Sequence, residues 1–401
     1  PGEVAAAARW KAALTEQSPF PVPAHVVEEL QTWGWRKEYL PVQGLPLLRE
    51  AVAAYHSRQD GVECQARDVL IGPGSKELMF LLQVAYHGDL VIPAPSWVSY
   101  APQAQILGRR VRFINTRVED DWKLLPEQLD DLCAEDPNRP RFLILNYPNN
   151  PTGVSYTADE LQQLAEVAER HRLFVLSDEI YGEVHHDGKH RSLASFYPQG
   201  TVISSGLSKW CGAGGWRLGT FTFPPSLRPL LEAMATVASE SYTSTSTPIQ
   251  CAAVRAFEYG PEMKDYLKHS RRVLKAVSRV VCQKLEGCGA RVAQPHGGFY
   301  AFPDFTALTQ PLAARGIRNS HQFCTRLLED TGVAILPGSD FGRPPEELTA
   351  RLAFVNFDGT RALLASEEAA VDSLDDAFVA QRCSAVVEAV ERISAWVMVS
   401  R

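Results

Sequence analysis

Short runs of apolar residues alternate with amphipathic segments through the middle of the chain. Continuous runs such as FLIL at 142–145 and LFVL at 173–176 are typical of strands that are buried on both faces. Between them, Thr157 and Glu160 form a capping box that starts a helix. Helical spacing puts four apolar residues on one face of that helix: Leu161, Leu164, Ala165 and Ala168. Strands that alternate with helices predict an α/β fold, with a mostly parallel central sheet sandwiched by helices.

The same pattern continues on both sides of this segment. Further strands are expected at 68–71, 90–93, 202–203 and 218–223. The GPG turn before Ser75 leads into another predicted helix. An alanine-rich stretch at the start of the chain predicts one more helix, at residues 4–14.

The texture of the sequence changes after about residue 265. One long helix is predicted at 263–286, followed by short strands, glycine turns and a final helix near 384–396. This change predicts two domains, a large one that carries the parallel sheet and a smaller α+β one. The expected division is 36–265 for the large domain, and 1–35 with 266–401 for the small domain.

Composition and charge narrow the class of function. Of the 401 residues, 45% are hydrophobic and 22% are charged, which is ordinary for a globular protein. The net charge of −7 argues against a nucleic-acid partner, because nucleic-acid-binding domains usually carry a basic patch. No apolar run approaches the roughly 20 residues that span a bilayer, so no membrane partner is expected.

The eight cysteines form no C-x-x-C pair and fit neither a zinc site nor a disulfide framework. They predict reduced thiols and therefore a cytoplasmic location. The sequence begins at a proline, which leaves an upstream targeting segment open.

Four motifs follow one another, each at the end of a predicted strand. In an open α/β sheet, ligands bind at the carboxyl ends of the strands, so the four motifs predict a single site. Each motif alone is weak, because Pro-Thr-Gly is a common turn and a lone lysine is usually a surface charge. In chain order they are NYPNNPTG at 146–153, SDEIY at 177–181, SK at 208–209 and GWRLG at 215–219.

Taken together, the motifs resemble those of the class I/II aminotransferases, which are pyridoxal 5′-phosphate (PLP) enzymes of fold type I. The resemblance extends from about Phe20 to Arg351, and Arg217 lies eight residues after Lys209, as the family has it. It implies a PLP-binding large domain. Further matching segments are YLPVQGL at 39–45, GSK at 74–76, PSW at 95–97, GGFY at 297–300, LPG at 336–338 and RLAF at 351–354.

The resemblance implies a role for each residue around the cofactor ring. Lys209 holds PLP as a Schiff base and, once the substrate displaces it, moves the proton at the substrate alpha carbon. Asp178 keeps the pyridine nitrogen protonated, which PLP needs as an electron sink. Asn150 and Tyr181 hydrogen-bond the phenolic oxygen, and Trp97 stacks on the pyridine face.

The phosphate of PLP needs donors, and the resemblance supplies them. Gly74, Ser75 and Lys76 open a helix, whose first N–H groups and dipole bind an anion. Arg217 adds a planar bidentate cation. Two serines beside the lysine are further candidates: Ser205 and Ser208. Tyr39 resembles the tyrosine that reaches the phosphate from the neighbouring subunit, which implies a homodimer with shared active sites.

On the substrate side, Arg351 resembles the arginine that binds the alpha-carboxylate, with Asn150 and Trp97 beside it. A fixed carboxylate orients the alpha C–H bond for proton removal. Lys76 suggests acidic substrates such as aspartate or glutamate, because a Gly-x-Lys at this helix start occurs in some bacterial-type aspartate aminotransferases. The competing interpretation is that Trp33, Trp35 and Trp97 line an apolar pocket.

Some segments depart from the family or carry no role. Glu16 stands where relatives have a glycine, so the resemblance does not predict the shape of the substrate pocket there. Gly206 stands where some relatives have a phosphate-binding serine, so it does not predict a phosphate donor at this position. The segment 358–381 matches nothing in the family. His185 and His186 are expected to be loop residues near the mouth of the site and not metal ligands, because adjacent side chains of a strand point apart.

The resulting hypothesis is a PLP-dependent aminotransferase that moves an amino group between an L-amino acid and a 2-keto acid. A PLP-dependent lyase, of the C–S lyase or aminocyclopropane-carboxylate synthase type, stays open because it uses the same residues. A non-catalytic effector-sensing protein on this fold is the alternative from another class. A nicotinamide dehydrogenase is disfavoured, because no G-x-G-x-x-G turn follows the first strand.

Overall fold

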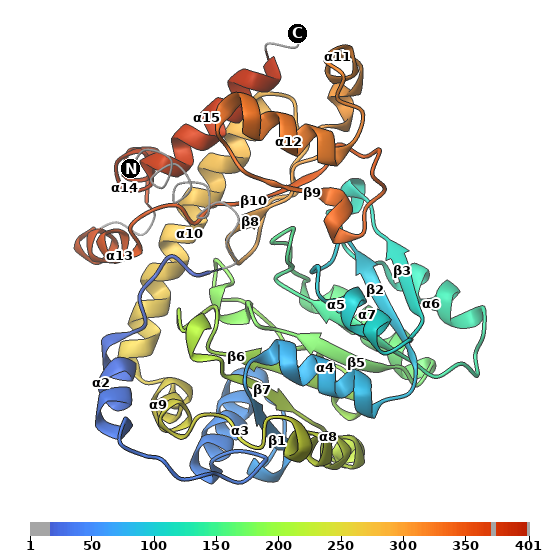
Figure 1. Ribbon diagram of the computed structural model, residues 1–401, viewed down its shortest axis with the longest axis vertical. Helices are drawn as coiled ribbons and strands as arrows, with labels where there is room; N and C mark the ends of the chain where they lie inside the picture. Colours follow the sequence, from blue (N-terminus) through green and yellow to red (C-terminus); the bar gives the residue numbers. More distant parts are fainter. Residues whose placement is uncertain (1–16, 370–373, 399–401) are drawn as a thin grey trace.

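The computed structural model describes residues 17–369 and 374–398 (Figure 1). The helix predicted at 4–14 and residue Glu16 lie outside these residues. No helix in the described part of the chain is both long and apolar enough to cross a membrane.

A seven-stranded sheet forms the centre of the lower part of the molecule in Figure 1, in the order β1-β7-β6-β5-β4-β2-β3. Strand β7 is antiparallel to both of its neighbours, and the other four strand pairs are parallel. The predicted mostly parallel sheet is therefore confirmed, with β3 as a strand that the pattern did not predict. The strands are β1 Val69–Gly72, β2 Asp89–Ala94, β3 Val111–Asn115, β4 Arg141–Asn146, β5 Phe174–Asp178, β6 Thr201–Gly206 and β7 Gly219–Thr222.

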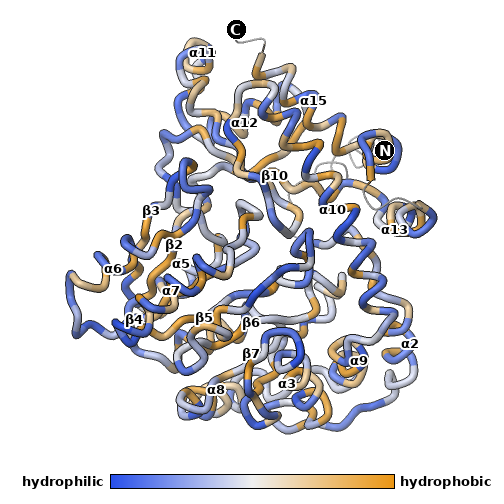
Figure 2. The backbone as a smooth tube through the Cα atoms, turned by 180° about the vertical axis from the view of Figure 1, so that it is seen from behind, coloured by the Kyte–Doolittle hydropathy of each residue, from blue (hydrophilic) through white to orange (hydrophobic). Residues whose placement is uncertain are grey.

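Helices cover both faces of this sheet, because its strands are apolar on both sides. In β4, Phe142 and Ile144 pack with α4, α5 and α8, whereas Leu143 and Leu145 pack with α6 and α7 on the opposite face. Hydrophobic residues accordingly gather along β2, β4 and β5 in Figure 2. The helices are α4 Ser75–Ala85, α5 Tyr100–Ile106, α6 Pro126–Ala134, α7 Ala158–Arg170 and α8 Arg228–Ser241.

The predicted capping box starts α7, where the Thr157 side chain accepts a hydrogen bond from the Glu160 N–H. The four residues of its predicted apolar face are all buried. The long helix predicted at 263–286 is also confirmed, as α10 Pro261–Gly287.

A second, three-stranded antiparallel sheet lies in the upper part of Figure 1, beside α10, α12 and α15. Its strands are β8 Tyr300–Ala301, β9 Leu336–Pro337 and β10 Ala350–Ala353. The remaining helices are α2 Ala24–Trp33, α3 Pro46–Asp60, α9 Thr247–Glu258, α11 Thr309–Ala314, α12 Ser320–Thr331, α13 Gly359–Glu368, α14 Asp376–Arg382 and α15 Ser384–Met398.

The division into 36–265 and the rest of the chain stays a prediction. Helix α2, which that division grouped with 266–401, packs against α9, which in turn packs against α3 on the side of the seven-stranded sheet. The segment 358–381, which matched nothing, forms α13 and most of α14. A Cβ on Gly359, at the start of α13, would lie 2.0 Å from the carbonyl oxygen of Pro19, so this helix packs directly on the N-terminal segment.

Arg343 connects the segment between β9 and β10 to the seven-stranded sheet. Its guanidinium donates to the carbonyl oxygens of Ala94 and Thr116, both at 3.0 Å, at the carboxyl ends of β2 and β3. It also forms two hydrogen bonds of 2.8 Å with Glu347 and lies over the Trp122 ring. Charge-assisted bonds in a buried position are strong, so the two sheets are held together at this point.

Candidate active site

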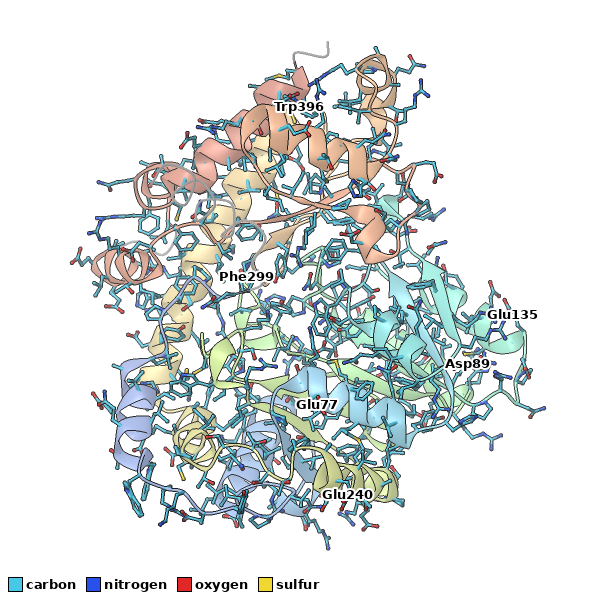
Figure 3. All side chains as sticks on the ribbon, in the orientation of Figure 1. Glu77, Asp89, Glu135, Glu240, Phe299 and Trp396 are labelled. Carbon is cyan, nitrogen blue, oxygen red and sulfur yellow. The ribbon has the colours of Figure 1, made fainter. Side chains whose placement is uncertain are left out.

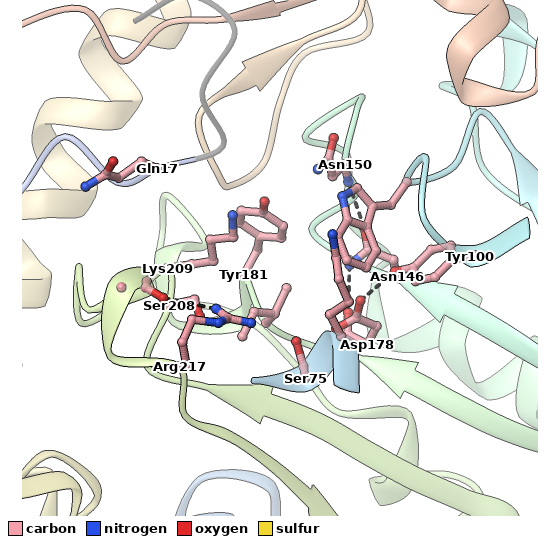
Figure 4. Close-up of a pocket in the computed structure, with 15 residues that line it drawn as sticks. Gln17, Ser75, Tyr100, Asn146, Asn150, Asp178, Tyr181, Ser208, Lys209 and Arg217 are labelled. Carbon is pink, nitrogen blue, oxygen red and sulfur yellow. Dashed lines mark hydrogen bonds between the residues drawn. The ribbon is translucent and has the colours of Figure 1, made fainter. Parts of the chain in front are cut away.

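A cavity of about 540 Å³ opens at the carboxyl ends of β4, β5 and β6 (Figure 4). The edge of the sheet explains why polar residues meet there, since the strand register pairs Asn146 with Asp178 and Asp178 with Ser204. Nine of the predicted site residues line the cavity: Ser75, Lys76, Trp97, Asn150, Asp178, Tyr181, Ser208, Lys209 and Arg217. It is also lined by residues without a predicted role: Gln17, Tyr100, Asn146, Ile180, Gly214 and Gly215.

Asp178 is the last residue of β5, and its side chain is 3% exposed. Burial raises the pKa of its carboxyl to about 6, although hydrogen bonds from Tyr100 and Ser204 favour the charged form. Among the described residues, no basic side chain forms an ion pair with it. A buried carboxylate of this kind fits a cationic group supplied by a ligand, such as a protonated pyridine ring.

The next residue, Glu179, is equally buried but has the opposite environment. It bonds the Nε2 of His190 at 2.8 Å and accepts from the hydroxyls of Ser177 and Ser192 at 2.7 and 2.6 Å. Although burial raises the pKa of Glu179, these partners bring it below its usual value. Of these two buried carboxylates, Glu179 is paired within the protein, and Asp178 is the one that fits a cationic group of a ligand.

Two residues that support Asp178 had no predicted role. The hydroxyl of Tyr100 donates to one carboxylate oxygen, and the side-chain amide of Asn146 donates 2.8 Å to the Asp178 backbone carbonyl. Asn146 belongs to the recognised NYPNNPTG motif, so the motif was its signal. Tyr100 lies three residues after Trp97, and the sequence around it is that of an ordinary core residue. Nothing in the sequence therefore marked it as a partner of Asp178.

Lys209 follows β6 and reaches into the cavity between two aromatic rings. Its Nζ lies 5.4 Å from the ring centre of Tyr181 and 5.8 Å from that of Phe299. Phe299 precedes β8, and Figure 3 shows it between the two sheets. The amine thus enters the cavity opposite the buried Asp178, with aromatic faces that favour a cation.

The first turn of α4 and Arg217 together form a cradle for an anion. Gly74 has a φ of +102°, and a Cβ there would lie 2.1 Å from Nη2 of Arg217. A Cβ on Gly219 would lie 2.2 Å from the backbone nitrogen of Ser75. Both glycines are needed, because any side chain would fill the space where backbone N–H groups and a guanidinium converge. This donor set suits a phosphate dianion.

Gly206 is explained by packing. A Cβ at this position would lie 2.6 Å from the carbonyl oxygen of Leu218, so the backbone leaves no room for the serine of some relatives. Of the two candidate serines, Ser208 lines the cavity. The expectation for Ser205 is wrong, because it lines a separate cavity of about 810 Å³ beside Glu179.

Trp97 and Lys76 form one wall of the cavity. The Trp97 ring packs edge-on against Tyr100, with ring centres 5.3 Å apart, and Lys76 Nζ lies 4.8 Å from the Trp97 ring centre. The neighbouring Ser96 N–H donates 3.0 Å to the carbonyl of Phe341, in the segment before β10. Lys76 is an exposed residue and is among those that line the cavity.

Arg351, in the three-stranded sheet, is not among the residues that line the cavity, but it contacts Asn150, which is. It lies in β10, is 2% exposed, and its Nη1 donates 3.1 Å to Oδ1 of Asn150. Its guanidinium carbon lies 4.7 Å from the Tyr300 ring centre and 5.1 Å from that of Phe341. The two residues predicted to bind the substrate carboxylate and the cofactor oxygen are thus in direct contact.

Other predicted residues lie elsewhere. Tyr39 is 86% exposed and is not among the residues that line the cavity. Trp33 and Trp35 contact each other and Arg36 near the surface, so they line no apolar pocket at this site.

The two adjacent histidines lie in a loop, as expected, but neither lines the cavity of the site. His185 and His186 are both buried, and His186 contacts the carbonyl of Gly298 at 3.0 Å. Burial lowers the pKa of His185 to about 3 and that of His186 to about 4, so both rings are neutral. They pack the GGFY segment into place, a role that depends on residues distant in the sequence.

The comparisons with known proteins agree with this geometry. The family described as aminotransferase class I and II matches residues 12–358. An aspartate aminotransferase of Geobacillus stearothermophilus is 33% identical over 336 residues, which cover 81% of this chain and 82% of the relative.

Two solved structures share the fold. An aspartate aminotransferase from Thermus thermophilus with maleate gives a TM-score of 0.78 at 28% identity, and covers 88% of this chain and 89% of its own. An aromatic aminotransferase from Pyrococcus horikoshii gives a TM-score of 0.81 at 26% identity, and covers 95% and 94%.

The buried carboxyl of Asp178 predicts a pH-dependent stability. Its pKa of about 6 lies above the ordinary value of 3.8, so the folded protein binds this proton more tightly than the unfolded chain. Stability from this group is therefore lost as the pH rises from about 4 to about 6. At pH 8, cofactor-free Asp178→Asn should exceed cofactor-free wild type by about 1–3 kcal/mol in unfolding free energy.

Urea denaturation at pH 8 and near pH 4 measures this difference, which should vanish at the lower pH. Glu179→Gln is the matched control, and it should lower the stability at pH 8 by about 1 kcal/mol or more, because His190 loses its partner. If Asp178→Asn is no more stable than wild type at pH 8, the conclusion that the Asp178 carboxylate has no basic partner among the described residues is wrong.

Proposed function

Because this chain belongs to the class I and II aminotransferase family, it is a PLP-dependent transaminase, and we propose that Lys209 is the lysine that binds the cofactor and moves the proton at the substrate alpha carbon. When bound, PLP withdraws electrons from the alpha carbon of the amino acid. The named relatives are transaminases, which favours amino-group transfer over the lyase and effector-sensing alternatives.

One observation carries the assignment of roles. The Lys209 amine, the buried Asp178 carboxylate and the cradle at the start of α4 all border one cavity of about 540 Å³. In the proposal, Arg217 with the backbone of Gly74 and Ser75 binds the phosphate, and Ser208 adds a donor. Asp178 keeps the ring nitrogen protonated.

The remaining residues orient the ring and the substrate. Tyr181 and Asn150 donate to the phenolic oxygen, while Trp97 covers one face of the ring. Arg351 binds the alpha-carboxylate and fixes the alpha C–H bond in reach of Lys209. The contact between Arg351 and Asn150 supports this arrangement, because it brings the substrate carboxylate beside the cofactor oxygen.

Borohydride reduction followed by peptide mapping tests the assignment of Lys209. Reduction of the cofactor-loaded protein should leave a pyridoxyl group on Lys209 and abolish activity, whereas Lys209→Ala should bind PLP only noncovalently. Among the described residues, Lys76 is the other lysine that lines the cavity, so Lys76→Ala should still be labelled on Lys209. A label on any other lysine would refute the proposal.

We propose acidic amino acids as the preferred donors. Lys76 lines the cavity with its Nζ beside Trp97, where it can meet a second carboxylate of the substrate, and several relatives are named aspartate aminotransferases. An aromatic aminotransferase shares the fold, so preference for an aromatic donor is the competing outcome.

The preference is tested with kcat/KM for aspartate, glutamate, phenylalanine and alanine in wild type and in Lys76→Met. The substitution keeps the apolar stem and removes the charge. It should reduce kcat/KM for the two acidic donors by about 5- to 30-fold, equivalent to about 1–2 kcal/mol, and leave the other two within about twofold. Equal losses on all four donors, or a wild type that prefers phenylalanine, would end this proposal.

We also propose a homodimer in which Tyr39 completes the phosphate site of the partner subunit. Tyr39 is 86% exposed, and the same segment exposes Trp35 at 71% and Leu47 at 62%. Large exposed apolar side chains close together in the chain are typical of an interface.

The eight cysteines, all within the described residues, are free thiols, which supports the expected cytoplasmic location.

Subunit mixing tests the shared site. Tyr39→Ser and Lys209→Ala should each be impaired, but a mixed dimer has one site with both natural residues. Random pairing should then restore up to about a quarter of the wild-type activity. The activity of a mixture of wild type and Lys209→Ala is the reference with which the restored activity is compared. No recovery in the Tyr39→Ser mixture, or an active monomer in light scattering, would contradict the shared site.

A further inference from the structure

Tyr300 lies between the two residues that the proposed function assigns to the substrate and to the cofactor. It is fully buried at the start of β8. Its ring centre lies 4.7 Å from the guanidinium carbon of Arg351, and its hydroxyl lies 3.1 Å from the hydroxyl of Tyr181. Tyr300 therefore contacts Arg351 through its ring and Tyr181 through its hydroxyl.

The sequence before Tyr300 makes this position possible. Gly298 has a φ of +67°, and a Cβ on it would lie 3.4 Å from the Tyr181 ring. A Cβ on Gly297 would lie 2.5 Å from the Pro148 side chain, in the turn that carries Asn150. Two glycines in sequence thus let this strand approach the cofactor side of the site closely enough for Tyr300 to reach Tyr181.

If Tyr181 donates its proton to the cofactor, the hydrogen bond between the two hydroxyls can form in only one direction. Each phenol has a single proton. With its own proton directed at the phenolic oxygen, Tyr181 must accept from Tyr300. Hydrogen bonds in a chain polarise one another, so a donor behind Tyr181 makes Tyr181 a stronger donor.

The ring of Tyr300 acts on Arg351 by a separate route. A buried guanidinium over an aromatic face is stabilised electrostatically, and the planar contact restricts its orientation. Phe341 provides a second aromatic contact, at 5.1 Å, but it has no hydroxyl with which to bond Tyr181. Phe341 therefore separates the effect of a ring from the effect of a hydroxyl.

We infer that Tyr300 is a positioning residue that couples substrate binding to the cofactor, its ring orienting Arg351 and its hydroxyl donating to Tyr181. This inference rests on the proposed roles of Arg351 and Tyr181. It assigns two functions to one side chain, and each function is removed by a different substitution.

The experiment uses the cofactor-loaded protein and three variants: Tyr300→Phe, Tyr300→Leu and Phe341→Leu. Two quantities are measured, the pH midpoint of the absorbance change of the bound cofactor and the dissociation constant of maleate. Tyr300→Phe should raise the midpoint by roughly 0.2–0.6 pH unit, because the cofactor oxygen loses part of its hydrogen bond, and should leave maleate affinity within about twofold.

Tyr300→Leu should shift the midpoint equally and also weaken maleate binding by roughly 2- to 30-fold, the range expected for one cation–π contact. Phe341→Leu should weaken maleate binding by a similar factor and leave the midpoint unchanged. Thermal unfolding of each variant identifies loss of fold, and the nearly isosteric Tyr300→Phe remains decisive if either leucine variant fails to fold.

The outcomes distinguish this inference from the proposed function. If Arg351→Ala leaves maleate affinity unchanged, or Tyr181→Phe leaves the midpoint unchanged, the underlying role of that residue is wrong. If those two variants behave as proposed but Tyr300→Phe does not move the midpoint, the relay through the hydroxyl is refuted. If Tyr300→Leu binds maleate as tightly as wild type, the support of Arg351 by the ring is refuted.

Discussion

The burial of the Asp178 carboxylate, with no ion-paired basic side chain among the residues that the structure describes, is the constraint around which this cavity is built. A charge in that position is costly unless a ligand supplies its partner. Tyr100, Asn146 and Ser204 hold the residue in place but leave its pKa raised to about 6. The protein therefore carries a local instability, which cofactor binding removes in the proposed arrangement, so that folding and cofactor binding favour each other there.

The contrast with Glu179 shows how one strand end supplies two different carboxylates. Successive side chains at the end of a strand point to opposite faces. On one face Asp178 meets Tyr100 and the cavity, and on the other Glu179 meets His190 and hydroxyl groups. The alternation of side chains along the strand thus separates the acid that is proposed to bind the cofactor, Asp178, from the acid that packs the loop after β5, Glu179.

Much of this could be predicted from sequence, and the failures share a cause. The apolar runs and the capping box predicted the sheet and α7, because these depend on residues close in the chain. The motif residues that line the cavity were also predictable, since parallel strands end at one edge. The position of Tyr100, the contacts of Tyr300 with Arg351 and Tyr181, and the burial of His185 depend on contacts between distant segments. Gly206 similarly depends on the Leu218 carbonyl, which no local pattern reveals.

The bonds of Arg343 to Ala94 and Thr116 have a mechanical consequence. They fix the middle of the loop between β9 and β10 to the ends of β2 and β3, while the strands on either side belong to the other sheet. Any relative rotation of the two sheets would then have to be absorbed on both sides of this anchor, in residues 338–342 and 344–349. Arg351 is the second residue of β10, so such a rotation would also displace its guanidinium relative to the end of β2.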